Sequence, residues 1–258
     1  MAGSHTSFDV LDADMKTRVM TDAHAMIQSL GKLHGCQTFG DIAGGIRYVG
    51  EHIIRVDVVF NRYTGENSIK AVARPKRVGK QKPICNRIEG PHISLLQRME
   101  HLHCLWWKQG LSYPLFIGCH HDKGKYLPEQ YKIMMGGGFI NTTDTRSTRR
   151  DQTKLSRNHE EADTRLILHA SEATDRGWER VLVICRDTYV LLLLVQFMPA
   201  VEVWMVAGIA RKRKCYPLNE VSQRLTQPVR DNLFSFHALT GCDTTPAFSG
   251  HGKRSWWK

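Results

Sequence analysis

The chain has 258 residues, 41% of them hydrophobic, and its 36 lysines and arginines against 25 aspartates and glutamates give a formal net charge of +11. This length allows one large domain or two small ones. The longest apolar run is too short to span a bilayer and the N-terminus lacks the apolar core of a secretory signal, so we expect an intracellular protein without a membrane partner. The positive charge suits a polyanion such as nucleic acid, or equally a solvated basic surface.

In the N-terminal half, residues 19–27 predict a short strand that runs into a helix. Asp22 lies at the turn, where it can cap the helix or bind a metal ion. A second helix is expected over residues 38–49, and Val56–Phe60 predicts a strand. A basic segment at 70–82 follows, which can either grip phosphates or remain solvated.

The middle of the chain gives weaker signals. Residues 85–126 fit no regular pattern, and the histidines and cysteines between 101 and 121 match no closed four-ligand zinc spacing. Seven cysteines without a CxxC pair argue against a disulfide framework and favour a reducing intracellular compartment, and Cys36, Cys185 and Cys215 are expected in the core. Residues 141–158 are polar and basic, which predicts a loop.

The most regular patterns lie after residue 160. Glu160, Glu161 and Asp163 open a stretch whose apolar residues recur at three and four positions, which predicts a helix that ends near Gly177. The apolar runs 181–184 and 190–195 do not alternate, so both are expected to be buried parallel strands. Asp187 lies between them.

Further elements are expected towards the C-terminus. Val201–Val206 predicts another strand, and 218–225 a helix. Between them, 211–214 is a basic loop that also offers a weak nuclear-import signal.

The order of several motifs resembles one nuclease family. EEADTR at 160–165, RDTYVLLLLV at 186–195, FHALTGCDTT at 236–245 and VDVVFNRY at 56–63 together resemble the PIN-like, flap-endonuclease-type nucleases. They are more similar still to a group of animal proteins of mobile-element origin. The likeness covers residues 19–82 and 128–258, whereas 92–126 do not resemble the family.

The resemblance implies a single PIN-like domain over residues 1–258, interrupted by a divergent insert at 85–126 and a basic loop at 141–158. Its fold would be α/β, with three α/β/α layers around a central, mainly parallel sheet. Such nucleases are hydrolases that hold two Mg²⁺ or Mn²⁺ ions about 4 Å apart in a carboxylate cluster.

The resemblance also assigns roles to single residues. Asp22, Glu161 and Asp163 would bind the first metal ion, and Asp187 and Asp243 the second. The nucleic-acid contact, with DNA favoured over RNA, would involve the cations of the basic segment: Lys70, Arg74 and Arg77.

Two positions depart from the family pattern. Asn61 and Tyr189 stand where the family has aspartates, so each presumed metal site lacks one anionic ligand. We therefore expect a degenerate metal-dependent nuclease-like domain with weak phosphodiesterase activity or none. The alternatives are a non-catalytic basic nucleic-acid-binding module and a non-functional mobile-element remnant. A nuclear location is a further expectation, which rests only on the basic residues 211–214 and the presumed nucleic-acid substrate.

Overall fold

The structure is a computed structural model, and it describes the part of the chain that carries the sheet and the C-terminal helices. The described residues are 17–22, 53–61, 132–137, 143, 145–147, 155–159, 161–198, 202–208, 214–242, 245–248 and 253–257. The helices expected within 23–52, the basic segment 70–82 and the irregular segment 85–126 lie outside them.

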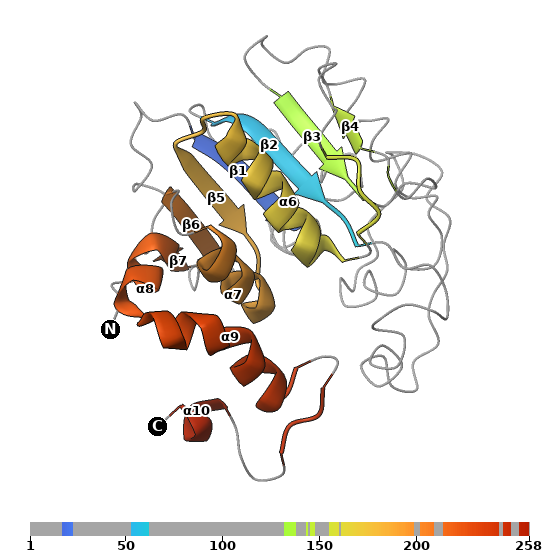
Figure 1. Cartoon of the computed structure of the whole chain (residues 1–258). Helices are drawn as coiled ribbons and strands as arrows, with labels where there is room; N and C mark the ends of the chain where they lie inside the picture. Colours follow the sequence, from blue (N-terminus) through green and yellow to red (C-terminus); the bar gives the residue numbers. More distant parts are fainter. Residues whose placement is uncertain are drawn as a thin grey trace, which may run out of the picture.

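Within the described residues, seven strands form one sheet in the order β4-β3-β2-β1-β5-β6-β7 (Figure 1). The strands are β1 (Thr17–Asp22), β2 (Ile53–Val59), β3 (Lys132–Gly136), β4 (Thr145–Ser147), β5 (Arg180–Ile184), β6 (Glu202–Ala207) and β7 (Lys214–Pro217). The central strands run parallel, and only the short edge strands β4 and β7 are antiparallel to their neighbours. The expected α/β class with a mainly parallel sheet is therefore confirmed.

The helices follow from local sequence signals. They are α6 (Ala162–Asp175), α7 (Thr188–Phe197), α8 (Leu218–Arg224), α9 (Gln227–Leu239) and α10 (Lys253–Trp256). On α6, Leu166, Ala170 and Ala173 form one fully buried stripe, as the periodicity predicted. The helix stops before Gly177, whose φ of 73° is readily available only to glycine.

The second apolar run was assigned wrongly, because residues 190–195 belong to helix α7 and not to a strand. A segment that is apolar on every side has no periodicity that distinguishes a buried helix from a buried strand. Two local features favour the helix. The run is rich in leucine, a good helix former, and the Asp187 side chain accepts a hydrogen bond from the backbone N–H of Tyr189, which caps the first turn.

Some of the other strands were predicted from the sequence and some were not. The expected strands at 56–60, 181–184 and 201–206 correspond to β2, β5 and β6. Strands β3 and β7 were not predicted, and β4 lies within the segment that was predicted to be a loop. These strands are short or lie at the sheet edge, where little alternation develops.

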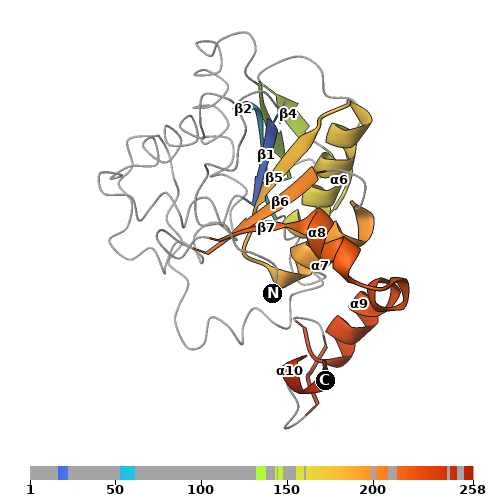
Figure 2. The ribbon, with the colours of Figure 1, turned by 90° about the vertical axis from the view of Figure 1, so that its left-hand side faces the viewer.

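Helices α6, α7 and α8 cover the same face of the sheet (Figure 2). The core on this face includes Val59, Val183 and Met205 from the strands, and Leu166 and Leu194 from the helices. Cys185 and Cys215 are buried, which confirms the expectation that these cysteines lie in the core. Side chains on the opposite face are also buried: Val56 and Val58 of β2 and Leu182 of β5 are at most 8% exposed.

Candidate functional site

Three adjacent parallel strands end in polar residues at one edge of the sheet. Strand β1 ends at Asp22, which pairs with Val59 near the end of β2, while Thr21 pairs with Ile184 at the end of β5. Asn61 follows β2 and Asp187 follows β5. Since β1 has β2 on one side and β5 on the other, this edge is the point at which strand order reverses, where open α/β sheets commonly bind ligands.

The start of α6 is fixed to the same edge by the side chain of a residue that follows β2. The Asn61 Oδ1 accepts a hydrogen bond of 2.7 Å from the backbone N–H of Ala162, the first residue of α6. Glu161, at the N-cap position, and Asp163, in the first turn, therefore lie beside the end of β2. Asp163 is 5% exposed, and both carboxylate oxygens of Glu161 are buried. Acidic residues at a helix N-terminus also interact favourably with the helix dipole.

A buried arginine holds the segment that precedes α6. Arg165 is fully buried, and its guanidinium donates hydrogen bonds to the carbonyl oxygens of His159 at 3.0 Å and Arg157 at 3.1 Å. The His159 ring lies 3.0 Å from the Thr164 hydroxyl. Burial, together with the positive charges of Arg165 and Arg157, lowers the pKa of His159 from its ordinary value. The Arg165 side chain thus fixes the backbone of residues 157–159, just before the acidic start of α6.

Asp187 and Tyr189 have clear local roles. The half-buried Asp187 caps α7, with its Oδ1 2.8 Å from the Tyr189 backbone nitrogen. The Tyr189 ring stacks on His237 of α9 at a centroid distance of 5.8 Å and meets Phe234 edge-on at 6.0 Å. This ring therefore joins α7 to α9. A carboxylate has two oxygens, so the Asp187 cap occupies only one of them.

The outcome for the predicted ligands is uneven. We call the edge at which β1, β2 and β5 end the acidic edge of the sheet. Glu161 and Asp163 lie at the start of α6 and Asp187 at the start of α7, both at this edge, and Asp22 shares it by strand register. The structure describes the backbone of Asp22 but not its side chain. Four other predicted residues lie wholly outside the described residues: Asp243, Lys70, Arg74 and Arg77. Among the residues that the structure does describe, no group of three or more His, Cys, Asp or Glu side chains is arranged to hold a metal ion.

A buried ionic network, which the sequence analysis did not predict, lies beneath α6. Asp57 of β2 lies 2.8 Å from the Arg55 Nε and 2.6 Å from the His169 Nδ1, and Glu172 lies 3.0 Å from an Arg55 Nη. All four residues are at most 4% exposed. The only sequence signal was a pair of charged residues at alternate positions of an otherwise apolar strand. Their complete burial indicates that this network joins β2 to α6 rather than binding a ligand.

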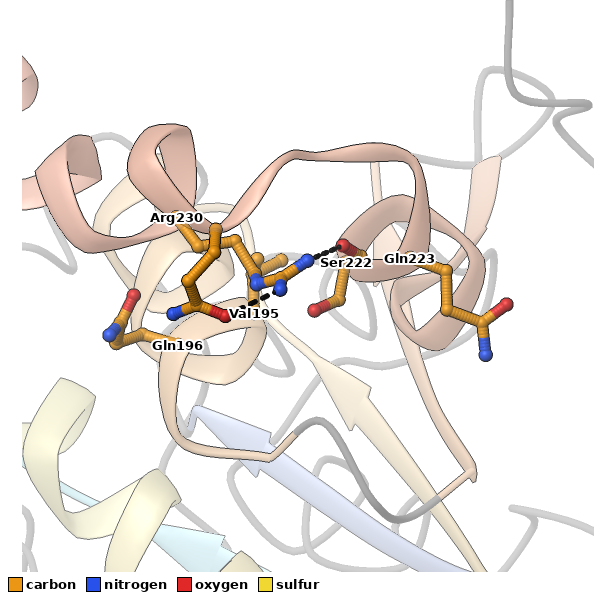
Figure 3. A pocket seen from close by; sticks show the side chains of 6 residues that line it. Val195, Gln196, Ser222, Gln223 and Arg230 are labelled. Atoms are coloured by element: carbon orange, nitrogen blue, oxygen red, sulfur yellow. Dashed lines mark hydrogen bonds between the residues drawn. The ribbon is translucent and has the colours of Figure 1, made fainter.

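A separate pocket lies at the far end of α7, where α8 and α9 meet it (Figure 3). It measures about 310 Å³ and is lined by Val195, Gln196, Ser222, Gln223, Gln227 and Arg230. The Arg230 guanidinium points across it and donates to the Ser222 carbonyl at 2.8 Å and to the Gln227 side chain at 2.6 Å. The Ser222 contact holds α8 against α9, and the Gln227 contact lies within α9. The Arg230 side chain is therefore used by the fold.

Two further results bear on the interpretation. Within the described ranges, every helix is too short or too polar to cross a membrane. Comparison with protein-family models, with curated proteins and with solved structures found no match to this chain.

Proposed function

We propose that this chain is a nucleic-acid-binding domain built on the framework of a metal-dependent nuclease, with a degraded metal site and weak phosphodiesterase activity or none. The observation that carries the proposal is the Asn61–Ala162 hydrogen bond. It brings the family-like acidic helix start to the end of β2, beside the strand end that carries Asp22. Motifs that are about a hundred residues apart in sequence therefore meet at one sheet edge, as a shared site requires.

The fold supports the same proposal. Parallel strands in the order β3-β2-β1-β5-β6, with polar residues at the reversal point, suit a PIN-like arrangement. Burial of side chains on both faces of β2 suits three layers. Fold alone does not carry an activity, so the site chemistry has to be tested directly.

The donor set fits a hard divalent cation. Carboxylates of Asp22, Glu161, Asp163 and Asp187 offer the oxygen ligands that Mg²⁺ and Mn²⁺ prefer. Asp243 follows the end of α9 in sequence and would complete the set. When bound, such an ion would supply Lewis-acid chemistry towards a phosphodiester. The chain's own residues would provide negative charge at this edge, and its overall charge of +11 would attract the nucleic acid.

The two replaced ligands explain why we propose weak activity. The Asn61 oxygen already accepts the Ala162 N–H, and it is neutral where the family has an anion. The Tyr189 ring packs on α9 and supplies no carboxylate. A second candidate function follows from these same contacts. Because both positions now serve the fold, the chain can act as a basic binding module that needs no metal ion.

Calorimetric titration with Mn²⁺ tests the proposal. The matched variant is Asp187→Asn, because asparagine also caps helices and so removes the charge while keeping the α7 cap. We expect wild type to bind Mn²⁺ weakly, Asp187→Asn to bind more weakly still, and Asn61→Asp to bind more tightly. Thermal unfolding of each variant checks that the fold is intact.

Nucleic-acid binding then separates the two functions. In the nuclease-derived domain, Mn²⁺ strengthens binding to a labelled oligonucleotide, and Asn61→Asp raises the cleavage rate. In the basic module, binding depends on salt and not on Mn²⁺. Equal Mn²⁺ binding by wild type and Asp187→Asn, or none by Asn61→Asp, would overturn the metal-site proposal.

A further inference from the structure

Aromatic side chains gather where α10 packs against the C-terminal half of α9. Trp257 meets Phe236 of α9 edge-on at a centroid distance of 5.1 Å, and Trp256 lies 5.9 Å from Phe248. We call these four residues the aromatic platform. Three of them are largely exposed: Phe248 by 57%, Trp256 by 51% and Trp257 by 55%. Contiguous exposed apolar surface commonly marks an interaction site.

The aromatic platform is held in place by a lysine. The Lys253 ammonium lies 2.7 Å from the Gly241 carbonyl oxygen, 2.9 Å from the Thr240 hydroxyl and 3.2 Å from the His237 carbonyl oxygen. A cation at a helix C-terminus is stabilised by the exposed carbonyl groups and the helix dipole. This contact fixes the short helix α10 against α9, so both tryptophans are carried on an anchored element.

Cationic residues flank the tryptophans in the sequence. Residues 253–258 read Lys-Arg-Ser-Trp-Trp-Lys, and the described residue Arg254 is exposed. Aromatic rings interleaved with cations are the usual surface for single-stranded nucleic acid, where rings stack on bases and cations contact the backbone. The large exposed apolar side chains of α10 and of residues 245–248 are all aromatic. In addition, α10 is far too short to form an amphipathic membrane-surface helix.

We propose that the aromatic platform binds single-stranded nucleic acid by base stacking on Trp256 and Trp257. This inference rests on the proposed nucleic-acid function and adds a binding surface separate from the acidic edge of the sheet. Figures 1 and 2 both show α10 beside α9, beyond the end of the sheet. A nucleic-acid strand could therefore bind to the platform without a metal ion at the acidic edge.

Fluorescence anisotropy with labelled oligodeoxythymidylate and with a duplex of matched length tests this proposal on the full chain. The variant is Trp256→Ala plus Trp257→Ala. Its control is Phe197→Ala, because Phe197 on α7 is similarly exposed, at 58%, but lies outside the platform. We expect the double variant to lose single-strand affinity by on the order of tenfold to a hundredfold, with little change in duplex binding. The Phe197 variant should bind as wild type does.

A conservative variant separates stacking from damage to the fold. Trp256→Phe plus Trp257→Phe keeps two rings, so single-strand affinity should recover to within a few-fold of wild type. Unchanged single-strand affinity in the alanine variant would overturn the platform while leaving the proposed function standing. Absence of nucleic-acid binding by wild type would overturn both. Tryptophan-dependent self-association, or tryptophan-dependent binding to anionic vesicles with no single-strand binding, would also overturn the platform.

Discussion

The Asn61 Oδ1 lies 2.7 Å from the Ala162 backbone nitrogen and accepts its hydrogen bond, so a residue that follows β2 caps a helix about a hundred positions later. The N-cap residue itself, Glu161, makes no side-chain capping bond. Helix N-termini have backbone N–H groups without intrahelical partners, and here tertiary structure supplies the missing acceptor. The bond fixes α6 on the sheet and places its acidic residues at the candidate site.

Asn61→Ala should lower the free energy of unfolding by about 1–2 kcal/mol, because the Ala162 N–H loses its acceptor. Asn61→Asp is the matched control. Its carboxylate also accepts the hydrogen bond, and its attraction to the helix N-terminus offsets repulsion from the neighbouring Glu161 and Asp163, so stability at neutral pH should exceed that of Asn61→Ala. Urea unfolding followed by circular dichroism measures both. Equal stability of all three proteins would show that the contact contributes nothing.

The buried ionic network should be far more sensitive. Asp57→Ala leaves the Arg55 guanidinium without its carboxylate at 2.8 Å and His169 without its partner at 2.6 Å, both in the core. Removing one member of a buried charged network costs about 3–5 kcal/mol. The same urea experiment provides the measurement.

A surface ion pair is the control for this network. Glu220 and Arg224 lie 3.3 Å apart on α8 and are each about half exposed. Glu220→Ala should change stability by less than about 0.5 kcal/mol, because water screens such pairs. If Asp57→Ala costs no more than Glu220→Ala, the network does not hold β2 against α6.

Gly137 and Gly177 form a matched pair for a steric test. Both have positive φ, 78° and 73°, but a Cβ at Gly137 would lie 2.3 Å from the Phe60 carbonyl oxygen, whereas one at Gly177 would meet nothing within 4 Å. Gly177→Ala should cost about 1–2 kcal/mol for the left-handed backbone alone. Gly137→Ala should cost at least about 1 kcal/mol more, because the Cβ also clashes with the Phe60 carbonyl oxygen just after β2. Equal melting temperatures for the two variants would contradict this account.

His159 should make stability depend on pH. Its pKa in the folded protein lies below the ordinary 6.5, because burial and the charges of Arg165 and Arg157 disfavour its protonation. Below pH 6.5 the unfolded chain therefore binds a proton that the folded chain resists, and stability falls as the pH is lowered. Above that pH, the histidine is neutral in both states and the effect vanishes.

Comparing wild type with His159→Gln isolates this contribution from other titrating groups. Unfolding free energies should be measured in steps from neutral pH downwards. The stability of wild type relative to the variant should decline below pH 6.5 and level off near neutrality. A difference that does not vary with pH would exclude His159 as the source.

Some elements of this chain could be predicted because their signals are local. The three-and-four spacing of Leu166, Ala170 and Ala173 predicted α6, and Gly177 its end. The prediction of a strand at 190–195 was wrong because this run has no distinguishing local pattern. It is apolar on all sides, so only the cap from Asp187 and the packing of α7 distinguished helix from strand. The Asp57–His169 contact gave no pattern, because its partners are more than a hundred residues apart.

The parallel α/β character, the acidic start of α6 and the excess of positive charge could all be read from the amino-acid sequence, since each depends on the spacing or number of nearby residues. Tertiary structure alone decided what Asn61 and Tyr189 do. Both stand where the family that the sequence motifs resemble has aspartates, yet one caps a distant helix and the other packs between α7 and α9. Such roles depend on which strands and helices become neighbours, and that is set by burial of the whole core rather than by any short segment.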